Sequence, residues 1–201
     1  MGMDLSLSNV FHFISAISPL LLGFFLVMTS IFNQDLKGFV YLAGILFATI
    51  INVFVLNMVK SPRNPEASST CNLVNLPFNM TNYNNPSLNS VIIAFTMAYL
   101  IMPMQFSNQM NYSIISFLFG IFLLDGINKT LNKCTTSTGV ILGLLLGGVL
   151  GFTWYSIFHA AGYDSLLYFN EVTSNKVYCA RPKKQTFKCA VYKNGELVKT
   201  L

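Results

Sequence analysis

Charged and metal-binding residues are scarce in this chain, and their scarcity excludes most soluble classes of protein. Charged residues make up 9% of the 201 residues, against about 25% in an ordinary soluble domain. Two histidines and four cysteines are present, and no spacing among them resembles a zinc site. We therefore expect neither a metal nor another cofactor. Met1–Ser8 carries Asp4 and no basic residue, so we expect the first apolar run to remain as a signal anchor.

Long apolar runs take the place of the missing charge. They cover residues 10–32, 38–59, 90–106, 111–124 and 138–162. A helix rises about 1.5 Å per residue, so roughly 20 residues cross a hydrocarbon core of about 30 Å. The fourth run is short and Pro103 interrupts the third, but we count both as spans. We place no Asp or Glu in the middle of a span. The prediction is an all-α polytopic membrane bundle of five transmembrane helices, within residues 1–163.

The basic residues predict how the chain lies in the membrane. Five spans put the N-terminus and the loops 60–89 and 125–137 on one face, called side one below. The loop 33–37, the turn 107–110 and the C-terminal tail share side two. Side two carries eight Lys and Arg and side one carries four. The positive-inside rule then places the tail in the cytoplasm and the two long loops in a lumen or outside the cell.

Cysteines and glycosylation sequons divide in the same way. Cys71 and Cys134 lie on the two side-one loops, where an oxidising lumen would allow a disulfide between them. Two sequons, at Asn79 and Asn128, lie on the same loops. The other two cysteines, Cys179 and Cys189, belong to the tail, and in a reducing cytosol we expect free thiols there.

The tail, residues 164–201, is a different kind of sequence from the bundle. It partly alternates apolar and polar residues around 176–180, 186–192 and 196–198, with Asn194-Gly195 as a turn. This pattern predicts a small three-stranded β-meander. Such a unit is too small to be stable alone. We expect it to dock on the bundle, the membrane surface, or a cytoplasmic or capsid protein, and we do not expect it to bind nucleic acid.

A glycine stripe runs along the last apolar segment. Gly143, Gly147 and Gly151 recur every four residues, and small residues at this spacing let two helices approach closely in a membrane. The stripe serves either a contact inside the bundle or a homo-oligomer. The sequence leaves both alternatives open.

Short polar motifs stand at the side-one ends of the middle runs. They are, in chain order, Lys60, Arg63, Pro86-Ser87 and Asn128-Lys129. This order resembles the type 2 phosphatidic acid phosphatase family of membrane enzymes. The family has a Lys/Arg-Pro motif, a Pro-Ser-Gly-His motif and a Ser-Arg-x5-His-x3-Asp motif at these places. The resemblance covers residues 40–155 and implies a helical bundle that handles a lipid phosphate.

The family's catalytic positions are occupied by other residues here. Pro86 and Ser87 match, but Asn89 stands for the acid histidine, Thr135 for the nucleophilic histidine and Gly139 for the aspartate that orients it. The reaction needs an imidazole to attack phosphorus and a carboxylate to hold its tautomer. A threonine without an adjacent base is a poor nucleophile. The resemblance therefore implies a catalytically dead scaffold, and we predict that the protein is not an enzyme.

Binding of a phosphate headgroup does not need the lost groups. Basic and hydroxyl side chains at a membrane surface bind such groups. The candidates for this site are Lys60, Arg63, Ser87, Asn89, Lys129 and Thr135. Each also has a simpler role, as a charge that snorkels at a helix end or as a helix cap.

The leading hypothesis is a non-enzymatic multi-pass membrane protein with a structural or lipid-binding role. Compact membrane proteins rich in Asn and Lys resemble components of large DNA viruses with an internal membrane. That likeness implies a location in a virion or in an internal membrane of a host. Two alternatives stay open: an active lipid phosphatase that uses displaced residues, and a small-solute channel or transporter.

Overall fold

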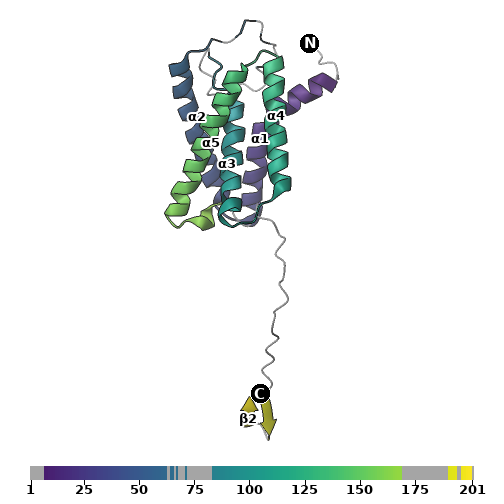
Figure 1. The fold of residues 1–201 in the computed structure, drawn as a ribbon, viewed down its shortest axis with the longest axis vertical. Helices are drawn as coiled ribbons and strands as arrows, with labels where there is room; N and C mark the ends of the chain where they lie inside the picture. Colours follow the sequence, from purple (N-terminus) through teal and green to yellow (C-terminus); the bar gives the residue numbers. More distant parts are fainter. Residues whose placement is uncertain are drawn as a thin grey trace.

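Five long helices form the body of the protein. The computed structural model describes residues 7–62, 64–65, 67, 71, 83–168, 190–193 and 196–200. The helices are α1 (Leu7–Asn33), α2 (Lys37–Val59), α3 (Leu88–Phe106), α4 (Tyr112–Leu131) and α5 (Ser137–Ala160). All five are long and apolar enough to cross a membrane, and they lie side by side in one bundle (Figure 1). The predicted five-span membrane protein is confirmed at this level.

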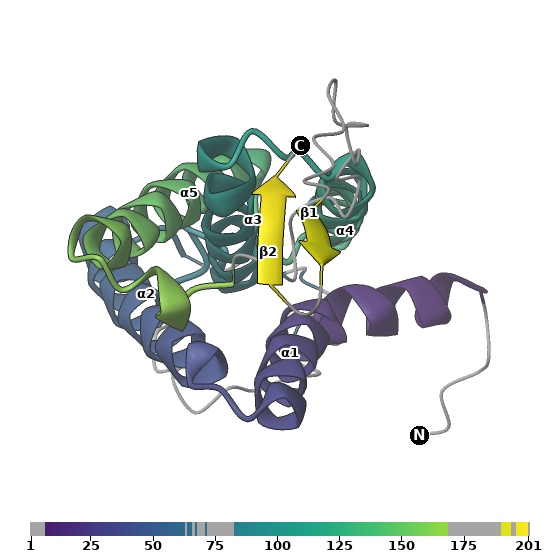
Figure 2. The same ribbon diagram turned by 90° about the horizontal axis from the view of Figure 1, so that it is seen from below.

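Helix α3 is the central helix of the bundle. It packs against each of the other four helices, and Figure 2 shows it enclosed by them. Its side chains Val91, Ile93, Phe95 and Met104 are fully buried. The other helices instead turn large apolar side chains outward, as helices in contact with lipid do. Polar side chains near the start of α3 are therefore held inside protein.

The glycine stripe of α5 packs against α3. A Cβ atom on Gly147 would overlap the carbonyl oxygen of Val91, and one on Gly151 would overlap that of Phe95. On Gly143 it would lie 2.8 Å from the Cβ of Ser90. Only glycine allows this close approach of two helix backbones. Of the two alternatives for the stripe, the structure shows the contact inside the bundle.

Helix α1 bends near Pro19. Proline lacks an N–H and its ring clashes with the carbonyl four residues earlier, so a helix kinks there. That carbonyl belongs to Ser15, and it accepts a hydrogen bond from the hydroxyl of Ser18 at 2.9 Å. Figure 2 shows the N-terminal part of α1 turning away from the bundle. The bend places Ser15 and Ser18 in buried positions.

Helix α4 is longer than the sequence pattern predicted. The fourth apolar run stops at residue 124, but α4 continues to Leu131, so the predicted loop 125–137 is reduced to residues 132–136. Asp125 and Lys129 are helical, four residues apart on one face. The sequon at Asn128 also lies in this helix and not in a loop. The other sequon, at Asn79, lies outside the described residues.

The chain packs on the bundle as far as Tyr168. A short 3-10 helix, η2 (Asp164–Leu166), follows α5. Leu167 and Tyr168 after it are buried, and the hydroxyl of Tyr168 donates a hydrogen bond to the carbonyl of Leu26 in α1. Five residues after the predicted boundary at residue 163 thus still contact the bundle or lie beside it.

Two strands are described in the tail. They are β1 (Ala190–Lys193) and β2 (Glu196–Thr200), which pair antiparallel with Lys193 opposite Glu196. The predicted turn at Asn194-Gly195 and the predicted strand around Cys179 lie outside the described residues. The three-stranded meander therefore stays a prediction.

Candidate functional site

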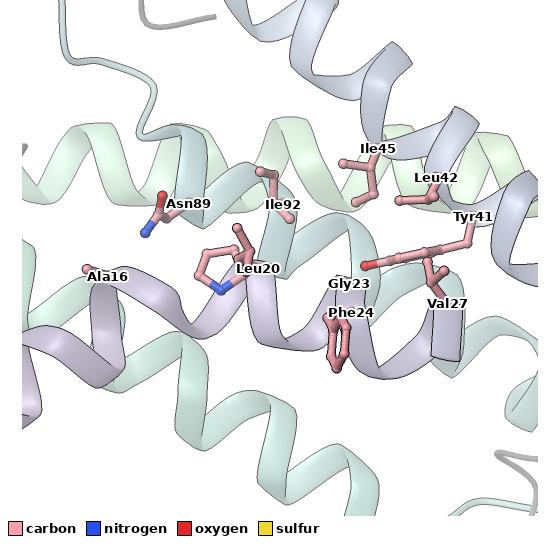
Figure 3. A pocket seen from close by; sticks show the side chains of 11 residues that line it. Ala16, Leu20, Gly23, Phe24, Val27, Tyr41, Leu42, Ile45, Asn89 and Ile92 are labelled. Atoms are coloured by element: carbon pink, nitrogen blue, oxygen red, sulfur yellow. The ribbon is translucent and has the colours of Figure 1, made fainter. Parts of the chain in front are cut away.

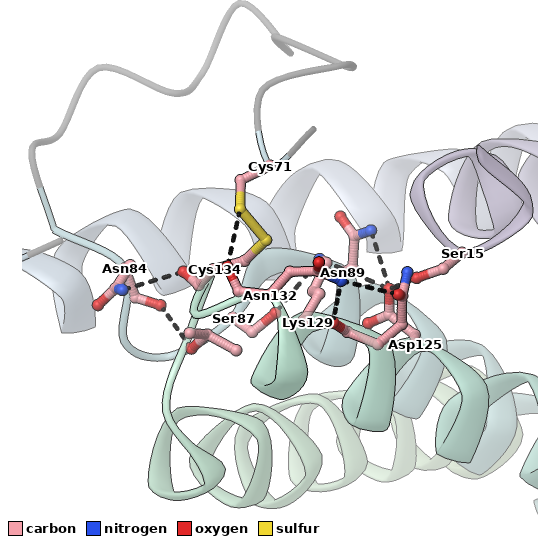
Figure 4. The surroundings of a disulfide bond; sticks show 11 residues. Ser15, Cys71, Asn84, Ser87, Asn89, Asp125, Lys129, Asn132 and Cys134 are labelled. Carbon is pink, nitrogen blue, oxygen red and sulfur yellow. Dashed lines mark hydrogen bonds and ion pairs between the residues drawn. A yellow bond between two sulfur atoms is a disulfide. The ribbon is translucent and has the colours of Figure 1, made fainter. Parts of the chain in front are cut away.

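A cluster of polar side chains is buried between α1, α3 and α4. Its members, called the Asp125 cluster below, are Ser15, Ser87, Asn89, Asp125 and Lys129 (Figure 4). One carboxylate oxygen of Asp125, Oδ1, accepts from Ser15 Oγ at 3.0 Å and from Asn89 Nδ2 at 3.3 Å. Lys129 Nζ lies 3.6 Å from the same oxygen and 3.5 Å from Ser87 Oγ. Three helices therefore meet at one carboxylate.

Each helix brings its polar residue to the cluster for a local reason. Asp125 lies six residues before the end of α4, about 9 Å along the helix axis. Lys129, one turn later, has a stem long enough to reach back to it. Ser87 is the N-cap of α3, and its N–H donates to the carbonyl of Gly139 in α5 at 3.1 Å. The bend of α1 at Pro19 brings Ser15 within hydrogen-bond distance of Asp125.

The electrostatics of the cluster are those of a nearly enclosed ion pair. The Asp125 side chain has no exposed surface, whereas 19% of the Lys129 side chain is exposed. A carboxylate this deep in a membrane protein is costly unless it is paired and hydrogen-bonded. Its second oxygen, Oδ2, has no hydrogen-bond partner among the described residues. This carboxylate oxygen can therefore accept a further hydrogen bond.

Asp125 and Ser15 were missed by the sequence analysis. We expected no Asp or Glu in the middle of a span, and this was wrong because α4 continues beyond the apolar run that Asp125 interrupts. The signal was present: Asp125 and Lys129 are spaced by four, so one helix can pair them. Ser15 had no comparable signal, because its role depends on how α1 bends toward α4.

A second polar network lies beside the first and contains Thr135. Its hydroxyl donates to Asn85 Oδ1 at 2.7 Å and lies 3.1 Å from the Asn84 carbonyl. The amide nitrogen of Asn85 donates to Ser61 Oγ at 2.8 Å and to Thr136 Oγ1 at 2.9 Å. A Cβ atom on Gly139 would overlap Asn85 Oδ1. The Asn85 side chain therefore fills the space beside Gly139, and position 139 admits no side chain.

A disulfide holds the side-one loops next to these networks. Cys71 and Cys134 are bonded, with Cα atoms 5.4 Å apart. The carbonyl of Cys134 also accepts a hydrogen bond from Asn84 Nδ2 at 3.0 Å. The bond thereby connects the long segment after α2 to the short α4–α5 connection, the two loops that the sequence analysis paired.

The predicted headgroup residues fall into three groups. Ser87, Asn89 and Lys129 come together in the Asp125 cluster. Thr135 is buried in the neighbouring network. Lys60 is exposed at the C-cap of α2, in a left-handed backbone conformation, and Arg63 lies outside the described residues. Of the residues described, none form a group of three His, Cys, Asp or Glu side chains that would hold a metal ion.

An apolar crevice begins at the Asp125 cluster and runs between α1, α2 and α3 (Figure 3). Its volume is about 410 Å³, within the roughly 300–1,000 Å³ of known ligand pockets. The wall on α1 extends from Ala16 to Val27, and Asn89 lies at one end. Asn89 therefore belongs to both the crevice and the cluster.

No family model, no curated protein and no solved structure matches this chain. Its assignment therefore rests on its own geometry: a multi-pass membrane protein of five apolar helices.

Proposed function

We propose that this protein is a non-enzymatic membrane protein that binds a lipid headgroup at the Asp125 cluster, on a scaffold related to the type 2 phosphatidic acid phosphatases. The observation that carries the proposal is the convergence of Ser87, Asn89 and Lys129, which come from different helices. The sequence motifs selected six candidates for a headgroup site, and these three are among them. Their convergence on a buried carboxylate supports a binding site over three separate helix-end roles.

The contacts and the charge of Lys129 favour a phosphate as the ligand. An ammonium group has three donors, and its two contacts in the cluster are long, at 3.5 and 3.6 Å. Part of the Lys129 side chain is exposed, so the cluster lies near the surface of the bundle. Asp125 offsets the charge of Lys129, so the site favours a phosphodiester, with one negative charge, over a doubly charged monoester.

Catalysis is not supported by these residues. The Thr135 hydroxyl is bonded to an amide and a carbonyl oxygen, neither of which is a general base for attack on phosphorus. Asn85 fills the space beside Gly139 where a carboxylate would be needed. Phosphate release from phosphatidic acid that Thr135→Ala abolishes would overturn this part of the proposal.

A channel is also disfavoured by the polar residues of α2. Asn52 is fully buried, whereas Asn57 is exposed. The two amides therefore do not line one pathway. A solute flux through liposomes containing the protein would contradict this reading.

The test of headgroup binding uses the purified protein in nanodiscs, with bound phosphatidylglycerol and phosphatidylcholine counted by native mass spectrometry. Asp125→Asn removes the charge that offsets Lys129, so we expect retention of the anionic lipid to rise. Adding Lys129→Met to that variant should lower retention about tenfold, because a charge-assisted hydrogen bond contributes roughly 1.5–3 kcal/mol. Lys60→Met, at an exposed lysine on the same side, is the matched control and should change nothing. Equal retention in all four proteins would refute the site.

A further inference from the structure

The apolar crevice has the dimensions of one lipid chain. From Ala16 to Val27 it follows α1 for 12 residues, and the 11 rises between them, at roughly 1.5 Å each, cover about 16 Å. Half of a hydrocarbon core of about 30 Å is roughly 15 Å. The crevice residues of α1 also recur at the three- and four-residue spacing of one helix face. The crevice is thus as long as one leaflet is thick.

The crevice is open toward the lipid. Leu20 and Phe24, on its α1 wall, are 51% and 59% exposed, and Leu42 on α2 is 37% exposed. These side chains form the rim, and in a membrane the rim faces acyl chains. Gly23 lies on the same wall, and a Cβ atom there would meet nothing within 4 Å. The space in front of Gly23 is therefore open.

Helix packing explains why the crevice exists. At side two, α1 and α2 touch: a Cβ atom on Gly38 would lie 2.8 Å from the Cβ of Ser30, and that serine's hydroxyl accepts from the Gly38 N–H at 2.9 Å. Toward side one, α1 bends at Pro19, which itself lines the crevice. The two helices are therefore joined at one end and separated at the other.

The polar end of the crevice is the Asp125 cluster. On α1, Ser15 donates to Asp125 and its neighbour Ala16 lines the crevice. On α3, Asn89 does both, since its amide nitrogen bonds Asp125 and its side chain forms the crevice end (Figures 3 and 4). An amphiphile with its chain in the crevice would place its polar group beside this cluster.

We propose that the crevice holds one acyl chain of a membrane phospholipid of the side-one leaflet. This inference rests on the proposed function, because the headgroup of the same lipid would lie at the Asp125 cluster. The lipid enters sideways from the bilayer, through the gap between α1 and α2. The bent α1 is thus one wall of a lipid site.

Glycines provide the test, because three glycines within the described helices have open space at Cβ and one of the three lines the crevice. Gly23→Phe would fill the crevice, whereas Gly120→Phe on α4 and Gly148→Phe on α5 add the same ring elsewhere on the lipid-facing surface. The probe is a phosphatidylglycerol with a photoreactive diazirine on one acyl chain, in nanodiscs. We expect the crosslinks to map to 16–27 of α1. Gly23→Phe should lower them about tenfold, a loss typical of steric exclusion from an apolar pocket.

The outcomes separate this inference from the proposed function. Crosslinks spread evenly over all five helices, and unchanged by Gly23→Phe, would overturn the crevice site. In that case an effect of Lys129 on headgroup retention would leave the proposed function standing. A loss of crosslinks in Gly23→Phe without any effect at Lys129 supports a chain site and refutes the headgroup site. Equal losses in the two control variants would also refute the inference.

Discussion

Asp125 connects three helices inside the bundle. It accepts hydrogen bonds from α1 and α3 and pairs with a lysine of its own helix. Removing one partner of a buried ion pair is far more costly than replacing both, because the remaining charge is left without compensation. The difference between the single and the double substitution therefore tells a buried ion pair from two independent charges.

We predict that Lys129→Met alone lowers the free energy of unfolding by about 3 kcal/mol, the lower end of the range for broken buried pairs, because Lys129 is partly exposed. The double variant with Asp125→Asn should recover most of the loss, since an amide needs no cation. Unfolding by SDS in mixed micelles measures both values. If the double variant were as unstable as the single one, the pair would not be the source of the effect.

In α5, the surroundings of each glycine show which side of the helix packs against protein and which side faces lipid. Gly147 and Gly148 are neighbours in α5, but only the first faces α3. A methyl group on Gly147 would overlap the Val91 carbonyl, whereas one on Gly148 would meet nothing within 4 Å. Because of the α3–α5 contact, a larger side chain fits at Gly148 but not at Gly147.

At this contact we expect Gly147→Ala to destabilise the bundle by about 1–3 kcal/mol, the usual cost of overpacking. Gly148→Ala should be neutral or slightly stabilising, because alanine favours a helix more than glycine does. The same mixed-micelle unfolding assay compares the two variants. Equal losses for both would show that α5 packs through a different face.

At the scale of the whole molecule, one disulfide links two segments that are distant in the sequence. The bond between Cys71 and Cys134 closes a loop across a sequence separation of 63 residues. In the chain-entropy account, a loop of this size stabilises the folded state by roughly 4 kcal/mol. Such a bond persists in oxidising compartments, so it agrees with the proposed lumenal or extracellular position of side one.

Counting free thiols tests this sidedness. We expect two cysteines of the protein made in cells, Cys179 and Cys189 of the cytoplasmic tail, to react with a maleimide-linked polymer. After reduction all four should react, as shown by the shift on a denaturing gel. Cys71→Ser should leave Cys134 as an added reactive thiol. Four reactive thiols before reduction would indicate that side one faces a reducing compartment.

Three residues of the candidate site could be predicted from the sequence, but Asp125 at its centre was not predicted. The resemblance in motif order selected six candidates, and three of them, Ser87, Asn89 and Lys129, meet in the Asp125 cluster. Asp125 was left out because the predicted fourth span ended at residue 124. A carboxylate can lie inside a span where it has a basic partner four residues later and buried donors to accept from, as Asp125 has in Lys129, Ser15 and Asn89.

The sequence by itself determined the membrane class and the five spans, because span length follows from local composition, and it indicated the pairing of Cys71 with Cys134. The tertiary structure alone decided which polar residues meet and where an apolar crevice opens. Those features arise from the Pro19 bend in α1 and from the close α3–α5 contact. Both are relations between helices, and no periodicity within one helix encodes the distance to the next.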